Sequence, residues 1–308
     1  MMGGKGYYWG SSVLVSGTAG TGKSTLAATF VDAACRRGER AVHFAFEESR
    51  SQVVRNMRSI GIDLEPHLQQ GLLEFHASRP TMQGLETHLA AIYKTIRDYQ
   101  PRVVVVDPIT NFFSVGTGEE VKAMLMRLVD FLKSQQVTSL FTSLTQGGTS
   151  TEQTDVRVSS LIDTWLLLRD MDVNGERNRV LYLLKSRGMS HSNQVREFFI
   201  TDRGLDLVDA YTGPEGVLTG SARVAQEARE RLATLLREQE IQQKQRVLDR
   251  KRQAIEAEIN ALRAGLEAEE EELRAALART GEREAQLARD RLEMARSRRE
   301  DASAGKGP

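Results

Sequence analysis

Short apolar runs alternate with longer amphipathic segments along the first 145 residues. The amphipathic segments repeat their apolar positions every three to four residues, which predicts helices at 24–37, 49–60, 83–99 and 119–135. The apolar runs between them predict strands at 13–16, 41–46, 72–75, 103–106 and 138–142. Continuous apolar strands separated by helices are typical of a mainly parallel sheet that is covered on both faces.

The pattern changes after Ser160. Strand-like segments follow one another without helices between them, and turns are expected at Asn174-Gly175 and Arg203-Gly204. This pattern predicts an antiparallel extension of the sheet. The expected strands are 161–169, 179–185, 194–201 and 205–208.

A third region, 223–301, has no aromatic residue, and 36 of its 79 residues are charged, 18 of each sign. Such a segment cannot build a compact core of its own. Its apolar residues instead recur at heptad spacing, which predicts a coiled coil. A single solvated helix, stabilised by oppositely charged pairs four residues apart, is the alternative. The two heptad rows are Leu248, Ile255 and Leu262, and Ile259, Leu266, Leu273, Leu287 and Met294.

Composition narrows the class of protein. Forty-two basic residues balance forty-two acidic ones, so no net charge attracts the chain to nucleic acid or to an anionic membrane. The single cysteine, Cys35, excludes an internal disulfide. The apolar runs are too short to span a bilayer, and the N-terminus lacks a signal-peptide pattern. We expect a soluble cytoplasmic protein.

The strongest chemical signal lies between the first strand and the first helix. Gly17-Thr18-Ala19-Gly20-Thr21-Gly22-Lys23-Ser24 matches the P-loop pattern G-x-x-x-x-G-K-[ST]. Its backbone N–H groups and the helix N-terminus bind phosphate, and Lys23 reaches the β- and γ-phosphates. The sequence therefore predicts ATP as ligand, with Ser24 as a Mg²⁺ ligand and Thr25 at the edge of the nucleotide site.

Acidic residues end two of the predicted strands. Asp107 follows four valines, where a second Mg²⁺ ligand is expected, and Glu47 and Glu48 end the strand at 41–46. One of these glutamates is expected to act as a general base in attack on the γ-phosphate. The alternative is that both simply precede a helix, because acids suit a helix N-terminus.

Several motifs, in the right order, resemble RecA-type ATPases and, within them, the second, autokinase half of the KaiC clock proteins. Those motifs are the P-loop, 46–50 (FEESR), 103–107 (VVVVD), 140–142 (LFT), 162–164 (IDT), 185–188 (KSRG), 196–200 (REFFI) and 215–223.

The resemblance implies roles for particular residues. Glu47 would be the general base and Glu48 its supporting acid. Lys185 and Arg187 would reach the γ-phosphate of a neighbouring subunit, and Ser186 and Arg179 would also contact nucleotide. Ser159 and Ser160 occupy the place of the paired phosphoacceptors, where the family usually has Ser then Thr. Autophosphorylation, its reversal onto ADP, and a homohexameric ring are therefore expected.

The chain also departs from the family. It has one ATPase domain instead of two and begins close to the P-loop, which favours its interpretation as the C-terminal half of a longer protein. Residues 215–223, which resemble the loop bound by the activator KaiA, lead directly into the predicted coiled coil. We therefore expect the coiled coil to join two rings, with a KaiB-like protein as a further candidate partner.

Two other functions stay open at this point. A DNA-processing helicase or recombinase would share the P-loop and the catalytic glutamate, but it needs basic central loops. The corresponding segment, 146–158, contains one basic residue, Arg157, and two acidic residues, Glu152 and Asp155, so it is not basic. A non-catalytic scaffold whose rings are held together by ATP would not need Glu47 and Glu48.

The sequence therefore predicts an α/β protein with a RecA-like P-loop ATPase core, a mainly parallel sheet and an antiparallel extension, followed by a long helical coiled coil. The expected domains are 1–222 for the ATPase and kinase, 223–301 for the coiled coil and 302–308 for a disordered tail.

Overall fold

The computed structural model describes residues 6–145, 160–173, 175–213 and 216–304. Ser159, the central segment 146–158 and residues 305–308 of the expected tail lie outside this part of the chain. The chain divides into two compact units, the N-terminal unit Met1–Glu227 and the C-terminal unit Ala228–Pro308.

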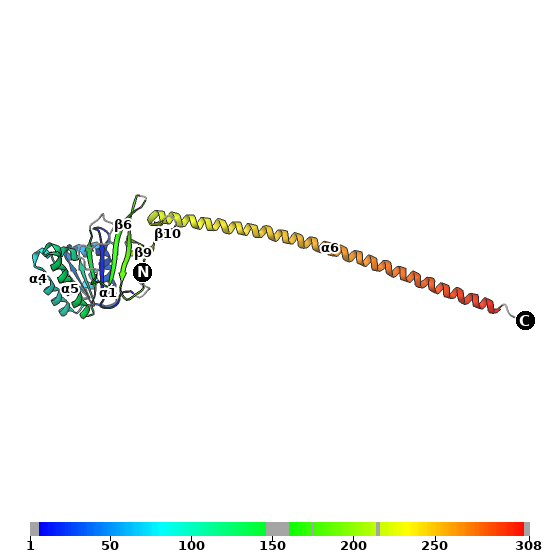
Figure 1. The fold of residues 1–308 in the computed structure, drawn as a ribbon, viewed down its shortest axis with the longest axis horizontal. Helices are drawn as coiled ribbons and strands as arrows, with labels where there is room; N and C mark the ends of the chain where they lie inside the picture. Colours follow the sequence, from blue (N-terminus) through cyan, green and yellow to red (C-terminus); the bar gives the residue numbers. More distant parts are fainter. Residues whose placement is uncertain (1–5, 146–159, 174, 214–215, 305–308) are drawn as a thin grey trace. The chain divides into compact units, whose positions relative to one another are not determined.

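The N-terminal unit is built on a nine-stranded sheet in the order β3-β2-β4-β5-β1-β6-β7-β8-β9 (Figure 1). All neighbours from β3 to β6 are parallel, and the pairs from β6 to β9 are antiparallel. The strands are β1 (Ser12–Gly17), β2 (Ala41–Ala45), β3 (Leu73–Ala77), β4 (Val103–Asp107), β5 (Thr138–Leu144), β6 (Thr164–Val173), β7 (Glu176–Ser186), β8 (Arg196–Thr201) and β9 (Gly204–Asp209).

The expected α/β fold with a mainly parallel sheet and an antiparallel extension is confirmed. One detail differs, because β6 pairs in parallel with β1 and the antiparallel part begins only at β7.

Helices cover both faces of this sheet, and the sheet separates the core into two layers. Strand residues alternate between the layers, as expected for a pleated strand: Val13 and Val15 pack with α1, and Leu14 packs on the opposite side with α4 and α5. The helices are α1 (Lys23–Arg36), α2 (Arg50–Arg58), α3 (Glu65–Gln69), α4 (Leu85–Tyr99) and α5 (Gly118–Ser134), with short 3₁₀ turns η1 (Pro80–Met82) and η2 (Ile109–Ser114).

A two-stranded hairpin, β10 (Tyr211–Gly213) and β11 (Gly216–Leu218), precedes the last helix, α6 (Gly220–Ala304). Glu197 of β8, which is fully buried, accepts a hydrogen bond from the Gly220 N–H at 2.7 Å and pairs with Arg223 at 3.3 Å. These contacts anchor the first turn of α6 within the N-terminal unit. The helix starts three residues before the expected coiled-coil segment and ends three residues after it.

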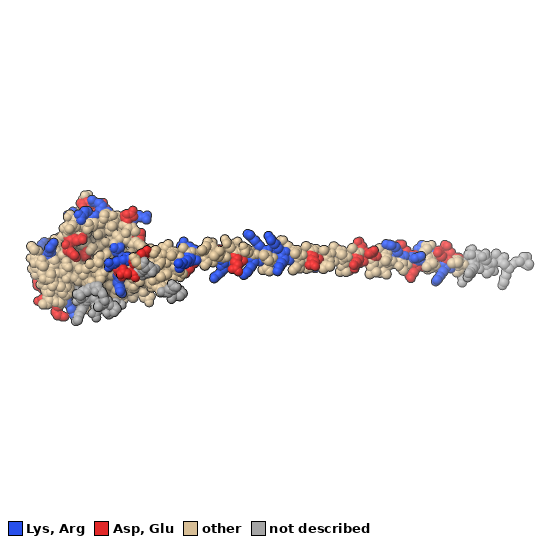
Figure 2. Space-filling view, turned by 90° about the horizontal axis from the view of Figure 1, so that it is seen from above, with Lys and Arg blue, Asp and Glu red and all other residues tan. Residues whose placement is uncertain are grey.

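The C-terminal unit contains the rest of α6. Each residue from 228 to 296 is exposed in the single chain, including both heptad rows. Figure 2 shows acidic and basic side chains mixed along this helix. Several form pairs four residues apart, such as Lys244 with Glu240 and Arg274 with Glu270. Among the described residues, no helix is both long and apolar enough to cross a bilayer.

Candidate active site

The P-loop joins the end of β1 to the start of α1, as the motif requires. Gly17 packs so closely that a Cβ there would lie 2.6 Å from the Leu168 carbonyl oxygen. Gly22 caps α1 with φ of 95°, a left-handed conformation that favours glycine. The Lys23 ammonium donates to the Thr18 carbonyl at 2.6 Å, so the lysine lies along the loop that would hold phosphate.

Glu47 and Glu48 lie between β2 and α2, beyond the carboxyl end of the strand. The cap of α2 is Ser49, which accepts a hydrogen bond from the Gln52 N–H in a capping box. The helix therefore does not use either glutamate side chain as its cap. Both carboxylates instead line the same pocket as the P-loop residues Lys23 and Ser24.

Asp107 ends β4 and lines that pocket as well. The Thr142 hydroxyl of β5 donates a hydrogen bond to its Oδ1 atom. On the other side, the Nε2 atom of His43 lies 3.9 Å from Asp107 Oδ2. The side chain of His43 is 1% exposed, and burial lowers its pKa although Asp107 acts in the opposite direction.

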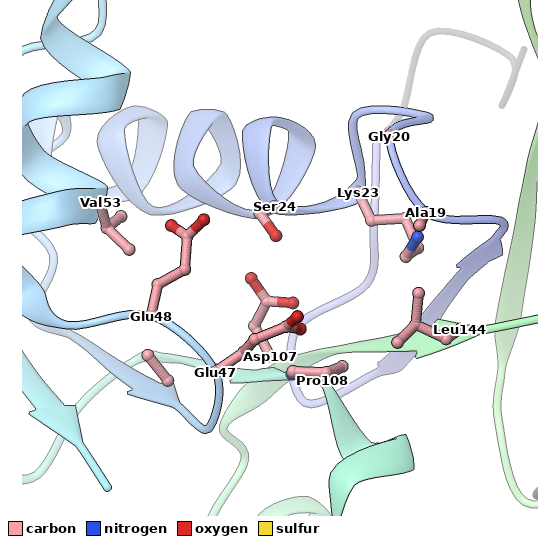
Figure 3. Close-up of a pocket in the computed structure, with 11 residues that line it drawn as sticks. Ala19, Gly20, Lys23, Ser24, Glu47, Glu48, Val53, Asp107, Pro108 and Leu144 are labelled. Carbon is pink, nitrogen blue, oxygen red and sulfur yellow. The ribbon is translucent and has the colours of Figure 1, made fainter. Parts of the chain in front are cut away.

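Figure 3 shows the carboxylates of Glu47, Glu48 and Asp107 directed into one space beneath Ser24, with Lys23 nearby. Burial lowers the pKa of Lys23, and Asp107, Glu47 and Asp170 oppose that shift. Burial raises the pKa of Glu48, and the charges of Asp107 and Glu47 raise it further. The pocket therefore holds an excess of negative charge that a cation would relieve.

The donors in this pocket fit Mg²⁺. A serine hydroxyl and carboxylate oxygens are the hard ligands that Mg²⁺ prefers, and Mg²⁺ usually takes only one or two carboxylates together with phosphate and water. Within the described residues, no group of three or more His, Cys, Asp and Glu side chains is arranged to hold a metal by itself. Ser24 and Asp107 thus suit a metal that arrives with the phosphates of a nucleotide.

The other expected site residues lie elsewhere. The pairing of Thr164 with Ser186 puts the end of β7 beside the beginning of β6, at the amino edge of the parallel strands. There the Arg187 N–H donates to the Asp163 carbonyl at 2.8 Å, and the Arg187 side chain donates to the Ser160 carbonyl at 2.5 Å. Lys185 belongs to the same cluster: burial lowers its pKa, Arg187 and Lys133 lower it further, and Asp163 opposes them.

Asp163 organises this amino-edge cluster, which we define as Ser160, Asp163, Lys185 and Arg187. Its carboxylate accepts hydrogen bonds from the backbone and hydroxyl of Ser12, both at 2.9 Å, and pairs with Lys133 at 2.9 Å. Burial raises the pKa of Asp163, but these hydrogen bonds outweigh burial and lower the pKa overall. The cluster is therefore fixed to the first residue of β1.

The pocket and the amino-edge cluster lie at opposite ends of the strands. The pocket follows Gly17, whereas the cluster is attached at Ser12, five residues earlier in β1. At about 3.3 Å per residue this is roughly 17 Å of strand. Arg179 does not belong to the cluster, because it lies opposite Asp170 in the strand register, near the other end of β7. Its Nε atom is buried without a hydrogen-bond partner within the described structure.

The structure also adds residues that sequence reasoning did not select. Thr142 lies in the motif 140–142, but its contact with Asp107 depends on the pairing of β4 with β5. His43 showed no metal-ligand spacing. The available signal was a histidine within the otherwise apolar run AVHFA.

The sequence is similar to known proteins of one family. The family model described as "ATPase: KaiC" matches residues 1–211. The chain is 51% identical to the circadian clock protein KaiC2 of Synechocystis sp. over 264 residues, which is 85% of this chain and 46% of that protein.

Two further relatives are more distant. The chain is 35% identical to KaiC3 of the same organism over 239 residues, 76% of this chain and 47% of the relative. It is 34% identical to the circadian clock oscillator protein KaiC of Thermostichus vulcanus over 234 residues, 75% of this chain and 45% of the relative. The chain spans less than half the length of these curated relatives. The P-loop pocket, the fold and these similarities together show that the chain belongs to the KaiC family of ATPases.

Proposed function

We propose that this protein is a ring-forming ATPase and autokinase, in which each pocket is completed by the amino-edge cluster of a neighbouring subunit. The pocket would bind and hydrolyse ATP. Ser159 and Ser160 of the neighbour would accept the γ-phosphoryl group, and Lys185, Ser186 and Arg187 of that neighbour would contact it. Arg179 would contribute a further nucleotide contact.

The separation of the pocket from the amino-edge cluster carries this proposal. Ser160 and Arg187 lie at one end of the strands, and the P-loop lies at the other. A rigid sheet of this kind cannot bring them together within one chain. A head-to-tail arrangement of copies would place the cluster of one chain against the pocket of the next, and such heterologous contacts close into rings.

The chemistry follows from the residues that meet in the pocket. The P-loop backbone and Lys23 would hold the β- and γ-phosphates. Glu47 would accept the proton of the serine hydroxyl as its oxygen attacks the γ-phosphorus, while the bond to the β-phosphate bridging oxygen breaks and ADP leaves. Glu48 would support Glu47. Return of the phosphoryl group to ADP is the same step in reverse.

Ser24 and Asp107 would hold Mg²⁺, which would supply positive charge to offset the negative charge of the phosphates.

The exposed heptad rows of α6 support pairing of this helix with a second copy, because a row of exposed leucines is stabilised when a partner covers it. We propose that paired helices join two hexamers. The match to KaiC2 covers more of the chain than the N-terminal unit, so the similarity continues into α6. A KaiB-like partner remains part of the proposal on family grounds.

A mixing experiment tests both the reaction and its direction across subunits. One chain carries Glu47→Gln and keeps its acceptors. The second keeps Glu47 and carries Ser159→Ala together with Ser160→Ala. We expect neither chain to be phosphorylated alone with Mg·ATP, and we expect phosphate on the Glu47→Gln chain after the two are assembled together, measured by intact mass and phosphopeptides.

Wild-type chain is the control for the assay. Phosphate on the Glu47→Gln chain alone would contradict the role of Glu47. A phosphorylated wild type with no phosphate in the mixed assembly would contradict transfer between subunits. ATP consumption by wild type without any phosphoserine would overturn the kinase and leave a ring ATPase.

A further inference from the structure

His43 is an anomaly in the core of the N-terminal unit. It is 1% exposed, and neither ring nitrogen has a hydrogen-bond partner among the described residues. Two other buried or largely buried histidines each have a partner for one ring nitrogen: His67 Nε2 contacts Asp32 at 2.9 Å, although its Nδ1 has no partner among the described residues, and His88 Nε2 contacts the Pro80 carbonyl at 3.0 Å. A buried polar group without a partner costs about 1–3 kcal/mol, so its presence needs an explanation.

Strand register places His43 beside the pocket. In the parallel pair β2–β4, His43 lies opposite Val105 and Ala45 lies opposite Asp107. Because side chains alternate between faces, His43 and Asp107 share one face of the sheet. The Phe75 ring of β3 packs on the imidazole, with ring centroids 4.8 Å apart, and limits its movement.

The two oxygens of Asp107 therefore have different neighbours within the sheet. Oδ1 accepts from the Thr142 hydroxyl of β5, on one side of β4. Oδ2 faces Nε2 of His43 on β2, on the other side, at 3.9 Å. This separation is about 1 Å longer than a normal hydrogen bond, so a small shift of the carboxylate closes it.

We propose that His43 is a positioning residue for Asp107, and that its Nε2–H group donates to Oδ2 when nucleotide and Mg²⁺ occupy the pocket. With Thr142 holding one oxygen and His43 the other, the carboxylate has one orientation, and its remaining lone pairs face Ser24. Hydrogen-bond partners of this kind orient a metal ligand and strengthen metal binding. The inference rests on the proposed nucleotide and metal site, but not on phosphoryl transfer to serine.

Affinity for ADP, measured by calorimetry with Mg²⁺ and with EDTA, tests this role without relying on turnover. His43→Leu replaces the imidazole with an apolar side chain of similar size and so removes the donor. We expect it to weaken ADP binding in the presence of Mg²⁺ by about 10-fold or more, the usual effect of losing a residue that orients a metal ligand. In EDTA, the ADP affinity of His43→Leu is expected to stay within about twofold of wild type, because without Mg²⁺ the variant loses no contact to the nucleotide.

Two variants provide the controls. His43→Gln places an amide donor near the position of Nε2 and should restore most of the Mg²⁺-dependent affinity. His67→Leu removes another largely buried histidine, on α3 and away from the pocket, and should leave both affinities unchanged. Equal Mg²⁺ dependence in wild type and His43→Leu would overturn the inference, and no ADP binding by wild type would overturn the proposed nucleotide site instead.

A crystal structure of the wild-type protein with Mg·ADP gives a second, independent readout, which also applies if His43→Leu fails to fold. We expect His43 Nε2 and Asp107 Oδ2 to lie within about 3.2 Å of each other, the range of an N–H···O hydrogen bond. A separation that stays near 3.9 Å in the occupied pocket would overturn the inference.

Discussion

The two units use the same residue, leucine, in opposite ways. Leu128 of α5 is fully buried, whereas Leu262 of α6 is 69% exposed. Both lie on helices with an apolar stripe, but the stripe of α5 packs on the sheet and α4 within its own chain. The stripe of α6 is exposed in the single chain from residue 228 to residue 296, the part of it whose side chains the structure describes. An apolar stripe therefore specifies that a helix needs a partner, not where the partner comes from.

ATP binding should depend on the N-terminal unit and not on the C-terminal unit. The largest expected effect therefore comes from a substitution in the N-terminal unit. Lys23→Ala is expected to weaken ATP binding roughly 100-fold, since charge-assisted contacts to phosphate are worth about 1.5–3 kcal/mol each. Lys244→Ala, in the C-terminal unit, is the matched control and should bind ATP like wild type. Titration with a fluorescent ATP analogue measures both, and equal loss in the two variants would contradict this division.

The second prediction tests whether a partner covers the stripe of α6. Leu266→Asp puts a charge in a heptad row and is expected to lower the assembly mass and the helix melting temperature, because burial of each leucine contributes about 1.5–3 kcal/mol. Ala264→Asp adds the same charge on the other side of the helix and should preserve the assembly. Light scattering and circular dichroism are the measurements; identical masses for both variants and wild type would favour a single solvated helix.

The third prediction concerns the contacts of Asp163 that hold the amino-edge cluster in place and stabilise the N-terminal unit. Asp163→Asn should destabilise this unit by about 2 kcal/mol at neutral pH, since it weakens the contacts with Lys133 and Ser12. Urea unfolding followed by Trp fluorescence measures the change. Asp98→Asn, at an exposed pair with Lys94, is the control and should cost less than about 1 kcal/mol.

The pH dependence of this difference has a definite sign. The pKa of Asp163 is lowered in the folded state, so its stabilising contribution is complete above the ordinary aspartate value of 3.8 and is lost as pH falls through the lower folded value. The gap between wild type and Asp163→Asn should therefore shrink below pH 3.8. A gap that persists unchanged at lower pH would contradict the role of the charge.

Much of the fold could be predicted because its signals are local. The strands before Asp107, the helices between them and the P-loop are each encoded within a few residues, and the structure places them where their patterns indicate. Strand order was not accessible in this way. The parallel pairing of β6 with β1 joins residues about 150 positions apart, and no short pattern near Thr164 distinguishes it from the hairpin strands that follow.

The candidate site divides in the same manner. The P-loop, Glu47, Glu48 and Asp107 were found from sequence, because each follows a recognisable strand. Neither the contact of His43 with Asp107 nor the anchoring of Asp163 to Ser12 carries a local signal, since each depends on pairing between distant strands.

The sequence by itself determined the phosphate-binding loop, the α/β alternation and the heptad rows, because periodicity and loop chemistry are properties of neighbouring residues. Only the tertiary structure decided that the P-loop pocket and the amino-edge cluster lie at opposite ends of one sheet. It also decided which oxygens of Asp107 face Thr142 and His43. These relations arise from strand register, and register is set by packing across the whole core.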